Sequence, residues 1–421
     1  MKVGIFSDTH LGFDAKGERC DESFDNLAQA INLCVQNGAD LIVLPGDVFD
    51  EPVPTHNNLY RAVQSFSASK KGSSQVKLTL EKGGQKSAIN YAGVPILAIH
   101  GNHEYLGKET RTALDVLNLS GVLVYFHAAT IVAQKGEEKL AVHGLGAVPE
   151  KKALAVMQHW NPIAVAGASN IMLVHQSFKE FMAIEDEMVS TLSLEDLPKG
   201  FDLIIDGHLH WASRQELPNA SEGGGKSVFL LAGSTIATSI KKLECEKPKG
   251  VHFFDTQTKE LSFVPIQSQR KMFYHQINLH EADAQMALSE CRAAIAGDLK
   301  ENFALKPLIR VNLKGSIKKG LAPSEIGLGE IFGEFSNRAI LSISKNFSAI
   351  DFKRKIADLQ QMQKSRLSVA QLGFELLEKN LQETDFGSAG IGAKELFDLL
   401  EKDEIDKAML LLTKDAHGTK P

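Results

Sequence analysis

Short apolar runs recur through about the first 265 residues, and each is followed by a polar or Gly-rich turn and then a helical pattern. The runs read VGIF, ADLIVLP, PILAIH, NIMLVH, FDLIIDGH, SVFLLAGS, VHFFD and LSFVPI. Runs of this length that are apolar on both faces and separated by helical segments are typical of buried strands in an α/β domain. Between the first two runs, Phe24, Leu27, Ile31 and Val35 recur at helical spacing. The pattern predicts an α/β domain over residues 1–267.

Residues 67–90 interrupt this pattern. They read SASKKGSSQVKLTLEKGGQKSAIN, which is polar and rich in Gly, Ser and Lys, and only VKLTL alternates. We expect a surface insertion containing a small hairpin. Its lysines could touch DNA, but a solvated loop is the favoured interpretation.

Residues 271–347 show the pattern of a smaller unit. A strand is expected around FYHQINL, a helix from Ala284 to Ile295, a strand at LIRVNLKG, a helix near 326–335 and a strand at AILSIS. In LIRVNLKG, apolar and polar residues alternate, which predicts a sheet with one buried and one solvated face. We expect an independent α+β capping domain here.

Residues 348–421 are charged and helical in pattern. Val369, Leu372 and Leu376 form one apolar stripe, and the Gly-rich stretch FGSAGIGA separates it from a second. The second stripe consists of Leu396, Leu399, Ile405, Met409 and Leu412. Two amphipathic helices at a chain end can dock on their own domain or form a hairpin that binds a partner.

The composition changes this picture little. A chain of 421 residues exceeds what one core usually organises, so two or three domains are expected. Four scattered cysteines without a CxxC pair fit reduced packing residues better than a zinc site or a disulfide frame. No apolar run approaches the roughly 20 residues that span a bilayer, and the chain starts with a strand-like MKVGIFSD instead of a leader. We expect a cytoplasmic protein with no membrane segment, associated with the nucleoid if prokaryotic.

The formal net charge of -6 argues against nucleic-acid binding through bulk electrostatics. It leaves room for binding at a local patch. Cationic residues cluster in sequence at Lys241, Lys242, Lys247, Lys249, Arg270 and Lys271. Taken singly, each of these lysines is expected to be a solvated surface charge.

The candidate chemistry follows the predicted strands. Asp and His side chains, with one Asn, leave the ends of five apolar runs within SDTH, GD, GNHE, LVH and GHLH. These residues are Asp8, His10, Asp47, Asn102, His103, His175, His208 and His210. Open α/β sheets place their sites at the carboxyl ends of strands, so we expect these groups to converge. Each motif alone is weak, because turns are rich in Gly, Asn and Asp; all five in this order make coincidence improbable.

The donor set is mixed oxygen and imidazole without thiolate, which suits manganese, iron or zinc and is too rich in nitrogen for calcium. Counting donors favours two ions. One ion would take Asp8, His10, Asp47 and His210, and the other would take Asp47, Asn102, His175 and His208. Asp47 would bridge them, since a carboxylate has two oxygens to share. His103 has no obvious metal, and we expect it to act on the scissile phosphate as a catalytic residue. The other nine histidines are expected to be structural.

The order DxH, GD, GNHE, H and GHxH resembles the calcineurin-like metallophosphoesterase superfamily. Finer features are similar to the SbcD-type double-strand-break repair nuclease, the meiotic recombination eleven family, in its archaeal-like form. These features are SDTHLG, GDVFD, LVHQS, DLPKGFDLIIDGHLH, AGSTIATS, KPLIRVNLKG and the terminal helices, so the resemblance covers nearly the whole chain.

The resemblance implies a two-sheet α/β sandwich with a small α+β capping domain and C-terminal helices. It implies a manganese-dependent nuclease acting on DNA, as an exonuclease on duplex ends and an endonuclease on single strands or hairpins. It also implies a coiled-coil ABC-type ATPase partner of the SbcC type, held by the C-terminal helices, and a homodimer formed through helices of the phosphoesterase domain. For the dimer we point to residues 113–119, which could equally pack on their own sheet.

Two positions depart from the family pattern. The family usually carries a second histidine at the position of Asp50, near the phosphate, and an acid there would repel the phosphate. Exonuclease activity would then be weakened while metal binding survives, unless His56 compensates. Glu104 stands where Asp is commoner, outside the ligand set. Two other functions remain open: a phosphodiesterase for small substrates on the same scaffold, and a weakly catalytic scaffold that tethers DNA ends.

Overall fold

The computed structural model describes residues 1–105, 110–182, 192–217, 227–318, 321–347 and 393–401, together with Phe374 and Leu377. The chain divides into two compact units. The first comprises Met1–His275, Ile295–Val311 and Glu334–Ser342. The second comprises Gln276–Ala294, Asn312–Gly333 and Ile343–Pro421.

A six-stranded sheet in the first unit has the order β14-β13-β1-β2-β5-β6. In that order its strands are Leu261–Pro265, Gly250–Asp255, Lys2–Ile5, Leu41–Pro45, Ile96–Ile99 and Val124–Tyr125. Strands β1, β2, β5 and β6 run parallel, whereas β13 and β14 are antiparallel additions. The parallel strands are buried on both faces, as their continuous apolar runs predicted.

An eight-stranded sheet has the order β11-β12-β10-β9-β8-β7-β3-β4. Its strands are Ser213–Leu217, Ser227–Leu231, Leu203–Asp206, Ser169–Val174, Glu138–Leu145, Ala129–Lys135, Lys77–Lys82 and Gln85–Ile89. Strands β8, β9, β10 and β12 are parallel. The segment predicted as an insertion supplies η1 (Ser67–Lys71) and the β3–β4 hairpin, and β3 pairs with β7, so the hairpin extends the sheet.

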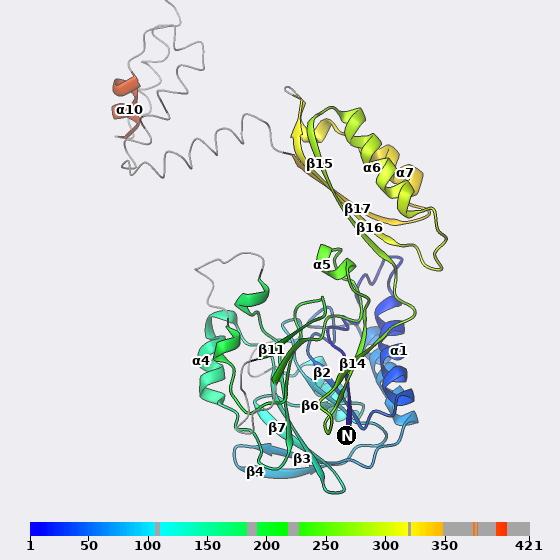
Figure 1. Cartoon of the computed structure of the whole chain (residues 1–421), viewed down its shortest axis with the longest axis vertical. Helices are drawn as coiled ribbons and strands as arrows, with labels where there is room; N and C mark the ends of the chain where they lie inside the picture. The colour runs from blue at the N-terminus through cyan, green and yellow to red at the C-terminus, as the bar shows by residue number, and fades with distance from the viewer. Residues whose placement is uncertain are drawn as a thin grey trace, which may run out of the picture. The chain divides into compact units, whose positions relative to one another are not determined.

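The two sheets pack face to face around a core that draws on both, for example Val3 and Leu97 from one sheet and Ile171 and Leu203 from the other. Helices α1 (Glu22–Gln36), α2 (His56–Phe66) and α3 (Ala113–Leu119) cover the outer face of the six-stranded sheet. Helix α4 (Glu150–Trp160) packs into the cluster on the outer face of the eight-stranded sheet. Figure 1 shows this helix, sheet, sheet, helix layering. The predicted two-sheet α/β sandwich is confirmed.

The remaining elements include the short helix α5 (Lys242–Cys245) and the turns η2 (Lys179–Phe181), η3 (Leu194–Asp196) and η4 (Pro323–Glu325). Strands β15 (Met272–Ala282), β16 (Leu308–Ile317) and β17 (Ile340–Phe347) form a three-stranded sheet. Helices α6 (Ala284–Asp298) and α7 (Gly329–Phe335) lie between these strands in sequence, where the pattern of 271–347 predicted helices.

Helix α10 (Ala393–Glu401) contains part of the second predicted C-terminal stripe. Most of the predicted helical hairpin lies outside the described residues. Within the described part of the chain, no helix is both long enough and apolar enough to cross a membrane.

Candidate metal centre

The candidate residues all lie in loops that follow parallel strands. The loops after β1, β2 and β5 carry Asp8 and His10, then Asp47, then Asn102 and His103. The loops after β9 and β10 carry His175, then His208 and His210. Both sheets therefore contribute, and the structure brings together the eight residues that the sequence had singled out.

The backbone of these loops is strained. Asp8, His10, Asp47 and His208 have φ angles of 50°, 42°, 46° and 68°. A non-glycine residue in this left-handed region costs of order 1 kcal/mol or more, and such residues cluster at functional sites. The loops also approach closely, because a Cβ added to Gly101 would lie 2.0 Å from Asp47 Oδ1. Only glycine fits there.

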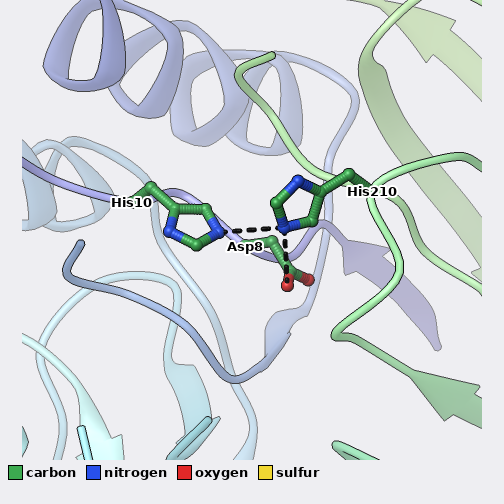
Figure 2. A group of neighbouring side chains, drawn as sticks. All are labelled: Asp8, His10 and His210. Atoms are coloured by element: carbon green, nitrogen blue, oxygen red, sulfur yellow. Dashed lines mark hydrogen bonds and ion pairs between the residues drawn. The ribbon is translucent and has the colours of Figure 1, made fainter. Parts of the chain in front are cut away.

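One group of donors consists of Asp8, His10 and His210, whose candidate ligand atoms lie within 4.8 Å of one another (Figure 2). The two Nε2 atoms of His10 and His210 are 3.1 Å apart, and His210 Nε2 is 3.9 Å from Asp8 Oδ1. Each imidazole has its other nitrogen occupied. His10 Nδ1 lies 3.2 Å from Asp50 Oδ1, and His210 Nδ1 lies 2.9 Å from Thr238 Oγ1.

A second group consists of Asp47, His175 and His208. His175 Nδ1 donates to the Pro45 carbonyl at 2.8 Å, which leaves Nε2 3.2 Å from Asp47 Oδ2. His208 Nδ1 lies 3.3 Å from Asn102 Nδ2. A half-turn of the Asn102 amide brings its oxygen to this place, as the expected metal ligation requires.

The donor chemistry fits cations. If both Nδ1 protons are held by Asp50 and Thr238, the Nε2 atoms of His10 and His210 present two lone pairs 3.1 Å apart. That contact needs a proton or a metal ion between them. Asp8 Oδ2 is buried and makes no hydrogen bond to any described residue. A buried polar atom without a partner is costly, and a bound cation would satisfy it. His175 Nε2 is also buried, and it faces the carboxylate of Asp47.

Burial and neighbouring charges shift the pKa values of the candidate ligands. Burial raises the pKa of Asp8 to about 6. Burial opposes charge on His175, but the carboxylate of Asp47 outweighs it and raises the pKa of His175 to about 10. The same pairing lowers the pKa of Asp47 despite its burial. Burial lowers the pKa of His208 to about 4 and takes the pKa of His210 well below its usual value, so both rings are neutral donors at neutral pH.

His103 is held differently from the other histidines. Its backbone N–H donates to Asp47 Oδ1 at 3.0 Å, and its Nδ1 donates to the Asp50 carbonyl at 2.5 Å. Nε2 is thereby left available. His103 is also one of a third donor group with His10 and Asp50. The structure therefore keeps His103 beside the other donors without tying its second nitrogen.

The sequence comparisons agree with this geometry. A sequence model of the family described as calcineurin-like phosphoesterase matches residues 1–212, which is half of the chain. The chain belongs to the calcineurin-like phosphoesterase family. Among curated proteins, the double-strand break repair protein MRE11 of Oryza sativa subsp. indica is 25% identical over 323 residues, covering 67% of this chain and 44% of that protein. The human protein of the same name is 25% identical over 312 residues, covering 66% of this chain and 41% of the relative.

The chain thus spans about half the length of these relatives. Among solved structures, a calcineurin-like phosphoesterase, YfkN of Bacillus subtilis, is 14% identical with a TM-score of 0.30, covering 63% of this chain and 88% of that chain. A dimetal phosphatase of Danio rerio is 13% identical with a TM-score of 0.32, covering 60% and 91%.

Several residues of the calcineurin-like site were missed by sequence reasoning. Ser177 Oγ lies 3.1 Å from His208 Nε2 and donates to Glu150 Oε1 at 2.6 Å, which orients the ring. Glu104 accepts from the backbone N–H groups of Phe49 and Gly101 at 2.7 and 2.8 Å and so ties two ligand loops together. Burial raises its pKa to about 7. Apart from the bond between Gly101 and Glu104, these contacts join segments at least 27 residues apart in sequence, so no local pattern could indicate them.

Lys249 was also missed. The sequence predicted a solvated surface charge at this position, but the Lys249 side chain is only 5% exposed. This prediction is wrong because Lys249 meets a buried carboxylate, Glu244, at 2.9 Å. Thr238 and Ser234 both lie in AGSTIATS, a segment that carried the family resemblance but no assigned role.

Proposed function

We propose that this chain is a nuclease that hydrolyses phosphodiester bonds of DNA with two divalent metal ions, taken to be manganese. The observation that supports it most is the convergence of seven oxygen and imidazole donors, among them a buried oxygen of Asp8 that makes no hydrogen bond to any described residue. The ligands proposed are Asp8, His10, Asp47, Asn102, His175, His208 and His210. Asp47 is proposed as the bridge because a carboxylate has two oxygens to share, and its charge acts on His10 of the first donor group as well as on His175 of the second.

A bound pair of divalent ions would supply a deprotonated water and hold the phosphoryl oxygens of an in-line displacement. The chain's own contribution is to hold the donors in place and to place His103 near the leaving oxygen. His103 Nδ1 is committed to the Asp50 carbonyl, so Nε2 is the atom that would deliver a proton to that oxygen or stabilise its charge.

DNA is proposed as substrate on two grounds. The curated relatives are named double-strand break repair proteins. The resemblance covers the segment beyond the family match, including the α+β elements that a small-substrate enzyme does not need. We propose exonuclease action on duplex ends and endonuclease action on single strands and hairpins, in a cytoplasmic protein.

A homodimer is proposed through helices α2 and α3. Helix α3 buries Leu114 and Leu117 in the core beside its own sheet. One face of this helix therefore packs within its own domain and is not available to a second chain. On the other face Val116 and Leu119 are 44% and 89% exposed, and Tyr60 on α2 is 64% exposed. Exposed apolar side chains on adjoining helices are what a self-complementary interface provides.

The partner proposed is a coiled-coil ABC-type ATPase bound by the C-terminal helices. The test is copurification of the ATPase with the full chain and with a chain lacking residues 364–421. Loss of binding is expected, and unchanged binding would refute the assignment to these helices.

The nuclease itself is tested with purified protein and manganese. Blunt duplex, hairpin and single-stranded DNA are offered beside a chromogenic diester, with Asp47→Asn as the matched inactive variant. We expect the parent chain to cleave DNA and the Asp47→Asn variant to lose this cleavage. Cleavage of the diester but of no DNA would instead favour a small-substrate phosphodiesterase, and binding of DNA without any cleavage would favour an end-tethering scaffold.

A further inference from the structure

Lys249 places a charged ammonium group in the interior directly behind the candidate metal centre. Its Nζ donates three hydrogen bonds: to the His210 carbonyl at 2.6 Å, to Ser234 Oγ at 2.8 Å and to Glu244 Oε2 at 2.9 Å. An ammonium has three protons, so every donor is satisfied. Among the described residues, its hydrogen bonds go to these three acceptors and to none of the proposed ligand atoms.

The counter-charge is equally buried. Glu244 is 1% exposed, and its second oxygen, Oε1, accepts from Ser239 Oγ at 3.1 Å. Removing an ion pair of this kind from water costs as much as its attraction returns, so a buried pair is weak evidence for stability alone. Its geometric effect is better defined: it holds the carbonyl of His210.

His210 is consequently fixed at two places. Its carbonyl accepts from Lys249 Nζ and from the Ser234 backbone N–H at 3.2 Å. Its ring meets Thr238 Oγ1 through Nδ1. The orientation of Nε2, the proposed ligand atom, follows from these restraints on the backbone and the ring.

The same segment reaches the loop of Asp8. Ser234 forms a parallel bridge with Ser7, and the Thr235 N–H donates to the Ser7 carbonyl at 3.2 Å. Ser7 directly precedes Asp8. Lys249 is thereby linked to two of the three members of the Asp8, His10 and His210 donor group. Its path to the second group is one step longer and runs through the His208 backbone N–H, which donates to Asp8 Oδ1 at 2.9 Å.

We propose that Lys249, with Glu244, is a positioning residue for His210 and so sets the affinity of one of the two metal positions, the one made by Asp8, His10 and His210. The inference rests on the proposed two-metal centre. A purely structural role would lower the stability of the whole unit and weaken both positions alike. If Lys249 positions His210, its replacement should weaken Mn²⁺ binding at one metal position only.

The experiment is a manganese titration of the full chain, followed by calorimetry and by the electron paramagnetic resonance signal of bound Mn²⁺. Lys249→Met keeps the length of the side chain and removes the charge. Because it leaves Glu244 unpaired, the double variant Lys249→Met with Glu244→Gln is measured beside it, and replaces it if the single variant does not fold. Controls are Lys259→Met, which removes a surface ion pair with Asp202, and Val142→Ala, which destabilises the buried core of strand β8.

We expect one of the two Mn²⁺ affinities to fall by about 10- to 100-fold in the Lys249 variants, the range for losing a group that orients a ligand. The other affinity should stay within about twofold. Lys259→Met should bind both ions as the parent does, and any loss of affinity in Val142→Ala should fall on both positions alike. His210→Ala should weaken the same position, and adding Lys249→Met to it should produce little further loss, since coupled residues are not additive.

Equal weakening of both positions, unchanged binding, or full additivity with His210→Ala would overturn the proposal. Failure of the parent chain to bind two ions is a different result. It would refute the proposed two-metal centre and remove the basis of this inference.

Discussion

His10 Nδ1 lies 3.2 Å from the carboxylate oxygen Oδ1 of Asp50, and the carbonyl of the same Asp50 accepts from His103 Nδ1 at 2.5 Å. One residue therefore orients a proposed metal ligand through its side chain and the proposed catalytic histidine through its backbone. A carboxylate hydrogen-bonded to a metal-binding imidazole fixes the ring and raises its basicity. The expected repulsion between Asp50 and phosphate remains a prediction, but the structure gives this acid a second effect in the opposite direction.

Replacing Asp50 separates these two effects. Asp50→Ala should lower Mn²⁺ affinity at the His10 position about 10-fold or more, because the ring loses its anchor. Asp50→Asn retains an acceptor oxygen without the charge, so it should bind Mn²⁺ nearly as the parent does and degrade duplex ends faster. Metal titration and duplex exonuclease rates measure both effects. Unchanged affinity in Asp50→Ala would show that the His10 contact has no consequence.

His103→Asn tests the catalytic assignment. The variant should keep two bound ions but lose about 10²- to 10⁴-fold in the rate of the chemical step, the range for general acid–base catalysis. Single-turnover cleavage of hairpin DNA, with metal content measured on the same sample, gives the answer. If His103→Ser or His103→Asn lost its metal while the chemical step survived, His103 would be a ligand.

Ion binding should also stabilise the fold, because the folded chain brings together donors that lie far apart in the unfolded chain. A ligand at 100 times its dissociation constant adds about 2.7 kcal/mol to the free energy of unfolding. We expect Mn²⁺ to raise the melting temperature of the parent and to have little effect on Asp47→Asn, which lacks the bridging carboxylate. An equal rise in both proteins would indicate nonspecific binding.

His252 gives the fold a dependence on pH that is independent of the metal centre. Burial lowers its pKa from 6.5 to about 4, so between these values the unfolded chain binds the proton and the folded one does not. Stability should be fully present above pH 6.5 and fall as the pH drops towards 4, by about 3 kcal/mol from this residue. Urea unfolding of the parent and of His252→Phe across pH 4.5–8 isolates the contribution of His252, since the other groups titrate in both proteins. If the difference in unfolding free energy between the two proteins did not change with pH, the prediction would be contradicted.

The fold and the convergence of the candidate ligands could be predicted from the sequence because both depend on local signals. Apolar runs at strand length placed the sheets, and Asp8, His10, Asp47 and the others follow those runs directly. The hairpin at 77–89 was recognisable from its alternation, but not its pairing with β7, which depends on contacts 50 residues away.

The supporting contacts could not be predicted for the same reason. Lys249 in isolation looks like any surface lysine of a charged stretch, and only the folded chain shows that Glu244 and the His210 carbonyl surround it. Asp50 was noticed through its departure from the family pattern, yet its contact with His10 depends on the loops after β1 and β2 running side by side.

The central claim is a DNA nuclease centre that needs two ions. It is tested most directly by titrating metal-free protein with Mn²⁺ while counting bound ions and measuring hairpin DNA cleavage in the same samples. The account predicts two ions per chain and cleavage that appears only as the second ion binds. Full cleavage with one ion bound, or no DNA cleavage with both bound, would contradict it.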